Sequence, residues 1–238
     1  MRLTFLKRYT MKDFFSLYLP LLGEQAMATF VGLVGMLMVS HAGDAALSAV
    51  GIVNTINLVV LSAFTALASG ATAVISQLLG ARRNKDAGAC TTQFLVVSVS
   101  AAIIIGTLMT IFVKPILYAF FGSSEQDVLD SAYIYLAASS LSVPFLVVST
   151  SISGIFRACR DNKTPMFVSI IVNIINALIC AVTIYIIEIG ILGASIAMLV
   201  ARIIGSILSI IMLLKPGMRS VSMPFAISKS FKVQMETI

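Results

Sequence analysis

Six long stretches with at most one charged side chain each dominate this sequence of 238 residues. A helix needs about 20 mostly apolar residues to cross the roughly 30 Å hydrocarbon core of a bilayer. Six regions meet that requirement, and polar, glycine-containing or proline-containing segments separate them. They lie near Phe14–Val39, Ala49–Leu79, Cys90–Val113, Ser131–Phe156, Met166–Ile187 and Ile189–Leu214. The sequence therefore predicts an all-α integral membrane bundle of six transmembrane helices.

The composition identifies the solvent that these stretches need. Hydrophobic residues make up 59% of the chain and charged residues only 11%, whereas a soluble domain carries about 25% charged residues. A soluble core could not hide this much apolar surface from water, so lipid must solvate most of it. The formal net charge of +6 does not indicate nucleic acid as a partner, because the basic residues form short clusters between apolar stretches.

Lysine and arginine residues predict the orientation in the membrane. Cytoplasmic loops of membrane proteins are enriched in these residues. Clusters occur before the first stretch and after the second, fourth and sixth, and with six spans all of them fall on one side. Fourteen of the sixteen basic residues belong to that side, while Lys114 lies on the other and Arg202 lies inside the sixth stretch. The pattern predicts a multi-pass protein of the cell membrane with both termini in the cytoplasm.

Three segments follow from this arrangement. We predict a cytoplasmic amino terminus over residues 1–13, a six-helix transmembrane lobe over residues 14–214 and a cytoplasmic segment over residues 215–238. The final segment Ser230–Ile238 is amphipathic and resembles Lys12–Leu17, which leads into the first stretch. Because transporters are often built from two homologous halves, we expect a second six-helix lobe as a partner. An ordinary cytoplasmic tail is the alternative.

Two charged side chains fall inside predicted spans, where a charge near the centre costs about 2.5–3.5 kcal/mol on insertion scales. Glu24 lies one turn after Pro20, whose ring removes a backbone hydrogen bond and can open the helix locally for gating. The Glu24 carboxylate either binds a proton, a sodium ion or a cationic drug, or packs near the inner interface. Arg202 either forms a structural ion pair with Glu24 or lines the transport path. We favour the structural role for Arg202.

Amide side chains supply further candidates for binding a substrate or cation. Asn173 and Asn176 are three residues apart and share one helix face, and Asn54 and Asn57 repeat that spacing in the second stretch. Their carbonyl oxygens can coordinate a cation, although hydrogen bonding between helices is the more common role of such amides. Gln25, beside Glu24, is a weaker candidate of the same kind.

Motifs of enzymes are missing from the sequence. It contains no GxxxxGK[ST] phosphate loop, no HExxH pair and no CxxC pair, and His41 is its one histidine. We therefore expect no ATP hydrolysis, no resident cofactor and no metal site. The protein is predicted not to be an enzyme.

Several segments resemble the MATE (multidrug and toxic compound extrusion) transporters. The similar segments are Leu19–Leu22, Ser40–Gly51, Ala71–Arg83, and the run from Phe156–Asp161 through Lys163–Pro165 to Asn173 and Asn176. The segment Gly190–Ala194 is similar to the entry to the sixth helix of that family. The likeness covers nearly the whole chain.

The resemblance implies a twelve-helix fold of two six-helix lobes, of which this chain would be the first. It also implies a secondary active antiporter that exports drugs or organic cations, driven by a Na⁺ or H⁺ gradient. Two other functions stay open. The first is a lipid-linked saccharide flippase of the same superfamily, and the second is a membrane scaffold or fragment that transports nothing.

This sequence departs from the pattern that the resemblance implies at two acidic positions. Gly35 and Cys180 stand where many prokaryotic relatives carry an aspartate, whereas Asn176 matches the asparagine of the family's fifth helix. Ion coupling would then depend on Glu24 or on acidic residues of the second lobe. Neutral residues of the first and fifth spans would line the substrate cavity.

Overall fold

The computed structural model describes residues 11–122 and 124–214, and all of its regular elements in that part are helices. Six of them are long and apolar enough to cross a membrane, which confirms the predicted number. The elements are α1 (Met11–Ser40), α2 (Asp44–Gly80), α3 (Asn84–Ile111), α4 (Val113–Phe121), α5 (Gln126–Ala158), α6 (Lys163–Ala181), the π-helical turn η1 (Val182–Ile186) and α7 (Gly190–Leu213). The predictions for residues 1–10 and 215–238 lie outside the described residues.

The helices extend beyond the predicted apolar stretches. For example, α2 begins at Asp44 rather than near Ala49, and α5 begins at Gln126 rather than near Ser131. The 37 residues of α2 span about 55 Å at 1.5 Å per residue, well beyond the hydrocarbon thickness. Hydropathy finds only the part of a helix that lipid covers. Between the third and fourth predicted stretches, the apolar residues Ile116–Phe121 belong to the short helix α4.

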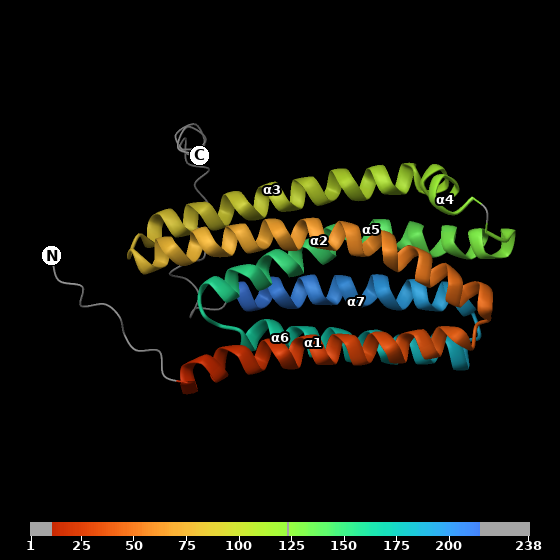
Figure 1. The fold of residues 1–238 in the computed structure, drawn as a ribbon, viewed down its shortest axis with the longest axis horizontal. Helices are drawn as coiled ribbons and strands as arrows, with labels where there is room; N and C mark the ends of the chain where they lie inside the picture. The colour runs from red at the N-terminus through yellow and green to blue at the C-terminus, as the bar shows by residue number, and fades with distance from the viewer. Residues whose placement is uncertain (1–10, 123, 215–238) are drawn as a thin grey trace.

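Helix α5 lies at the centre of the bundle and packs most extensively against α2, α7 and α3. Helices α6 and α7 also pack together, and α1 lies mainly against α6, at the side of the bundle opposite α3 (Figure 1). Most large side chains of α1 remain exposed, including Phe30, Leu33 and Leu37. Helix α1 is therefore the least enclosed of the membrane-length helices, and lipid or another helical lobe must cover it.

The connections alternate between the two ends of the bundle. The α2–α3 and α5–α6 connections lie at the same end as the start of α1 and the end of α7 (Figure 1). The α1–α2 and α6–α7 connections lie at the opposite end. The basic loops that contain Arg82, Arg83, Arg160 and Lys163 therefore share one end, as the sorting of charges predicts.

The two basic loops begin with the same backbone turn. After α2, the Arg83 amide donates to the Leu78 carbonyl at 2.9 Å, and after α5 the Asp161 amide donates to the Phe156 carbonyl at 3.0 Å. This bond, from one residue to the fifth before it, satisfies a carbonyl that the end of a helix would leave free. The residue within each turn has a positive φ, 59° at Arg82 and 62° at Arg160.

Candidate transport cavity

A cavity of about 340 Å³ opens within the bundle between α1, α2, α5, α6 and α7. Small residues on α1 leave the room for it. Ala28, Gly32 and Gly35 all line the cavity, and their spacing of four and three residues places them on one helix face. A Cβ atom added at Gly32 or Gly35 would meet no atom within 4 Å outside its own stretch of helix. The cavity therefore exists partly because α1 presents glycine where larger residues would fill the space.

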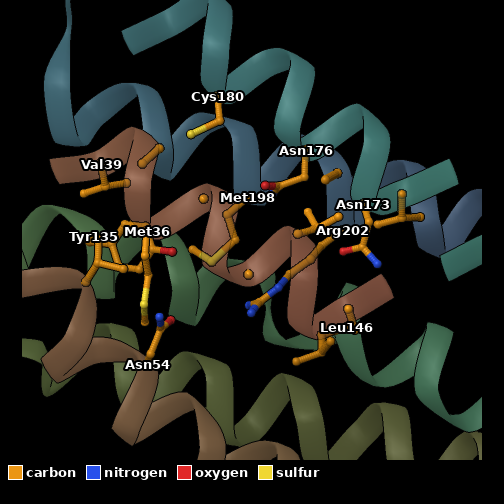
Figure 2. Close-up of a pocket in the computed structure, with 18 residues that line it drawn as sticks. Met36, Val39, Asn54, Tyr135, Leu146, Asn173, Asn176, Cys180, Met198 and Arg202 are labelled. Carbon is orange, nitrogen blue, oxygen red and sulfur yellow. The ribbon is translucent and has the colours of Figure 1, made fainter. Parts of the chain in front are cut away.

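Five polar side chains reach this cavity from four helices. They are Asn54 of α2, Tyr135 of α5, Asn173 and Asn176 of α6, and Arg202 of α7. Figure 2 shows Arg202 reaching from α7 into the middle of the lining side chains. Apolar residues, among them Met36, Leu146 and Met198, form much of the remaining wall. An apolar wall with a few convergent polar groups is typical of a small-molecule site.

A chain of hydrogen bonds positions Arg202. Its Nη1 donates to Ser142 Oγ at 2.6 Å, and Ser142 Oγ donates to the Ser139 carbonyl, also at 2.6 Å. Ser139 Oγ in turn donates to Asn57 Oδ1 at 2.6 Å. Ser139, Ser142 and Asn57 are all buried. These hydrogen bonds link α7, α5 and α2. They hold Nη1 of the guanidinium in place but do not neutralise its positive charge.

Glu24 has a different partner from the one considered in the sequence. Nη2 of Arg157 lies 3.1 Å from both carboxylate oxygens of Glu24. The Arg157 side chain is 36% exposed and the Glu24 side chain is 19% exposed. The alternative in which Glu24 pairs with Arg202 is therefore wrong. Arg157 is in the last turn of α5, and Glu24 is at its level in the first half of α1. Arg202, by contrast, lies near the middle of α7.

The remaining candidates separate into two groups. Asn173 and Asn176 line the cavity, and Asn173 Nδ2 donates to Ser169 Oγ at 3.3 Å. Glu24, Gln25 and Asn57 do not line it.

Three of the candidate residues from the sequence lie outside the cavity lining. Gln25 is exposed on α1, Asn57 is buried between α2 and α5, and Pro20 lies within α1, which stays helical through it. The amide of α2 that reaches the cavity is Asn54 rather than Asn57.

The positions singled out by the family resemblance meet in this one cavity. Gly35, Asn176 and Cys180 all line it. Among the described residues, no carboxylate lines the cavity, and Arg202 is its one charged side chain. With Gly35 and Cys180 at these positions, the local charge of the described cavity is positive.

Sequence reasoning missed Ser142, Tyr135 and the pairing role of Arg157. Ser142 carries a detectable signal, because Ser139, Ser140 and Ser142 form a small polar group within an otherwise apolar span. No feature of the sequence distinguishes Tyr135 or Arg157 in this way. A tyrosine is common in membrane helices, and the position of Arg157 is typical of a basic residue in a cytoplasmic loop.

The fold and the cavity define the class of this protein. It is a multi-pass helical membrane protein built like one lobe of a transporter, with a polar site inside the bundle. Comparisons with known proteins then give the family.

The chain matches the MatE family over residues 20–182. Uncharacterized transporter YisQ of Bacillus subtilis (strain 168) is 29% identical to it over 98% of this chain and 51% of its own length. The probable multidrug resistance protein NorM of Thermotoga maritima is 28% identical over 82% of this chain and 42% of its own length.

A solved structure shares the fold. It is an outward-facing multidrug resistance MATE family transporter of the MOP superfamily, which superposes with a TM-score of 0.85 at 19% identity over 92% of this chain and 49% of that chain. The chain belongs to the MATE family of membrane transporters. It spans about half the length of YisQ and NorM.

Proposed function

We propose that this chain forms the amino-terminal lobe of a secondary active antiporter that exports small organic molecules, including drugs, across the cell membrane. The observation that carries the proposal is the cavity between α1, α2, α5, α6 and α7, with its convergent polar groups. Family membership supports it. The length of the relatives supports a second six-helix lobe as the partner that completes the transport path.

In this proposal an inward flow of Na⁺ or H⁺ drives export. Organic cations are the substrates that the family resemblance implies. Since the described part of this cavity has no carboxylate, binding of the coupling ion falls to Glu24 or to acidic residues of the second lobe. Glu24 suits such a role only if Arg157 releases it during the cycle, because the pair neutralises both charges.

Helix α1 is the proposed moving element. It packs mainly on α6 and little on the rest of the lobe, so it can tilt without breaking the α2–α5–α7 core. Pro20 removes one backbone hydrogen bond in the amino-terminal third of α1. We propose that α1 bends there when the cavity changes its side of access.

Efflux from cells lacking their own drug exporters tests this function. Cells would express one of two proteins. The first is residues 1–238, and the second is the longer product of any reading frame that continues after Ile238. Retained ethidium, a cationic dye, and retained fluorescein, an anionic dye, would then be measured. Export that stops when an ionophore collapses the Na⁺ or H⁺ gradient supports the proposal and identifies the ion. Retention equal to that of cells with an empty vector, for both dyes and both forms, contradicts it.

A further inference from the structure

We infer that this cavity binds the anionic group of an organic molecule and that Arg202 is the residue that contacts it. The inference rests on the proposed function, since it assigns the substrate class of the same cavity. It concerns binding by this lobe and does not depend on which ion drives transport. The ligand class is an amphipathic organic anion whose carboxylate, sulfonate or phosphate group Arg202 can bind.

The first argument is the unbalanced charge of the site. A guanidinium inside a membrane bundle is expensive unless it is paired or reaches water. Arg157 shows the paired case, with both Glu24 oxygens 3.1 Å from its Nη2. Arg202 lines the cavity, and the described residues of that cavity offer it no carboxylate. A bound anion would supply the missing counter-charge.

The second argument is the geometry of the guanidinium. An arginine side chain has five N–H donors in a planar fork. The hydrogen bond to Ser142 engages Nη1 and holds the group in one orientation. Among the described residues, the bond to Ser142 is the one hydrogen bond of Arg202, yet its Nε and Nη2 atoms do not count as buried atoms without a partner, as Arg157 Nε does. They are therefore accessible from the cavity, where two oxygens of a carboxylate or sulfonate can accept from them side by side.

The third argument is the rest of the lining. Asn54, Asn173, Asn176 and the Tyr135 hydroxyl supply neutral donors around the guanidinium. The apolar wall suits the carbon body of a ligand, and a volume of about 340 Å³ lies within the range of small-molecule sites. An organic cation would meet Arg202 with no nearby carboxylate from this lobe. The described lining therefore favours an anion over a cation.

Equilibrium binding to the purified chain tests the inference separately from transport. The probes are fluorescein, an anion, and rhodamine 123, a cation on the same xanthene ring system, and fluorescence anisotropy in neutral detergent measures both affinities. We expect fluorescein to bind at least tenfold more tightly than rhodamine 123. Arg202→Gln should weaken fluorescein binding by about tenfold or more, and Arg202→Lys should weaken it less, because lysine keeps the charge but loses the planar fork.

Two further variants control the result. Arg83→Gln removes a positive charge from an exposed loop and should leave both affinities unchanged. Gly35→Asp keeps Arg202 and places a carboxylate at the cavity wall, where an added Cβ meets nothing within 4 Å. It should reduce the preference for fluorescein or reverse it. Gel filtration and thermal unfolding would establish that each variant is folded.

A parallel arm identifies the source of the anion. If short-chain phosphatidylglycerol displaces fluorescein from the wild type but not from Arg202→Gln, an anionic lipid headgroup can occupy the site. If phosphatidylglycerol does not displace fluorescein but unlabelled soluble organic anions do, the occupant is a free organic anion. Both results support the inference. Three results would overturn it, namely equal or tighter binding of rhodamine 123 by the wild type, fluorescein binding that Arg202→Gln leaves unchanged, and no fluorescein binding by a folded wild type. Transport assays can fail without affecting any of these outcomes.

Discussion

Glu24 and Arg202 show how differently two charged side chains can be accommodated in one membrane bundle. Glu24 is neutralised by Arg157, whereas Arg202 is held by a hydroxyl and lines the cavity. The sequence predicted that both lie within spans and that Asn173 and Asn176 share a face. It did not predict their partners, because a partner depends on how far each helix extends and which face it turns to its neighbour.

The Ser142 hydroxyl should position Arg202 for ligand binding. Ser142→Ala removes the acceptor for Nη1, and a hydrogen bond to a charged group contributes about 1.5–3 kcal/mol. We expect lower thermal stability and several-fold weaker fluorescein binding. Ser140→Ala is the matched control, because the Ser140 hydroxyl is buried but donates to the Leu136 carbonyl of its own helix. Equal losses of fluorescein affinity in the two variants would exclude a positioning role.

The Glu24–Arg157 pair should stabilise the contact between the first half of α1 and the end of α5. A double-mutant cycle of Glu24→Gln and Arg157→Gln, measured by unfolding in detergent, should give a coupling free energy of about 0.2–1 kcal/mol, as for partly exposed pairs. Neither variant should change fluorescein affinity much, because Glu24 and Arg157 do not line the cavity. Zero coupling would mean that the pair does not stabilise the fold.

At the scale of elements, α5 organises the bundle through a proline. Pro144 lies inside α5, so the Ser140 carbonyl one turn earlier lacks its usual amide donor. Helix α3 approaches this carbonyl at Gly106, where an added Cβ would lie 2.9 Å from the Ser140 oxygen and 3.4 Å from Pro144 Cδ. Hydropathy predicted α3 and α5 as membrane spans. It could not predict this contact or the π-helical turn after α6, because both depend on packing between helices.

Gly106→Ala should therefore separate α3 from α5. We expect a loss of about 1–3 kcal/mol of unfolding free energy, which is typical of overpacking against a group that cannot move easily. Gly70→Ala in α2 is the control, because a Cβ there meets nothing within 4 Å, and alanine favours a helix over glycine by up to about 1 kcal/mol. Unfolding of both variants in the same detergent gives the comparison. A Gly106→Ala variant as stable as wild type would show that α3 can shift without cost.

At the scale of the whole molecule, the count and alternation of the helices could be predicted from the sequence, because lipid sets the length of each span and basic residues mark alternate loops. The cavity could not be predicted, since its lining comes from five helices and each contributes only a few residues. The chain covers about half the length of relatives such as YisQ. Its cavity can therefore be one wall of a larger site, so the charge contributed by each wall matters separately.

The side of the membrane that carries the basic loops is testable at Cys159. This residue follows α5, where burial raises the pKa of its thiol and the negative charge of Asp161 raises it further. Less thiolate is then present at neutral pH, and labelling should accelerate as the pH rises toward that pKa.

With Cys90 and Cys180 replaced by alanine, an impermeant maleimide should label inside-out vesicles but not intact cells, and Asp161→Asn should label faster. Gln126→Cys, at the opposite end of α5, should show the reverse sidedness in a Cys159→Ala background. Labelling of Cys159 in intact cells would place the basic loops outside and overturn the predicted orientation.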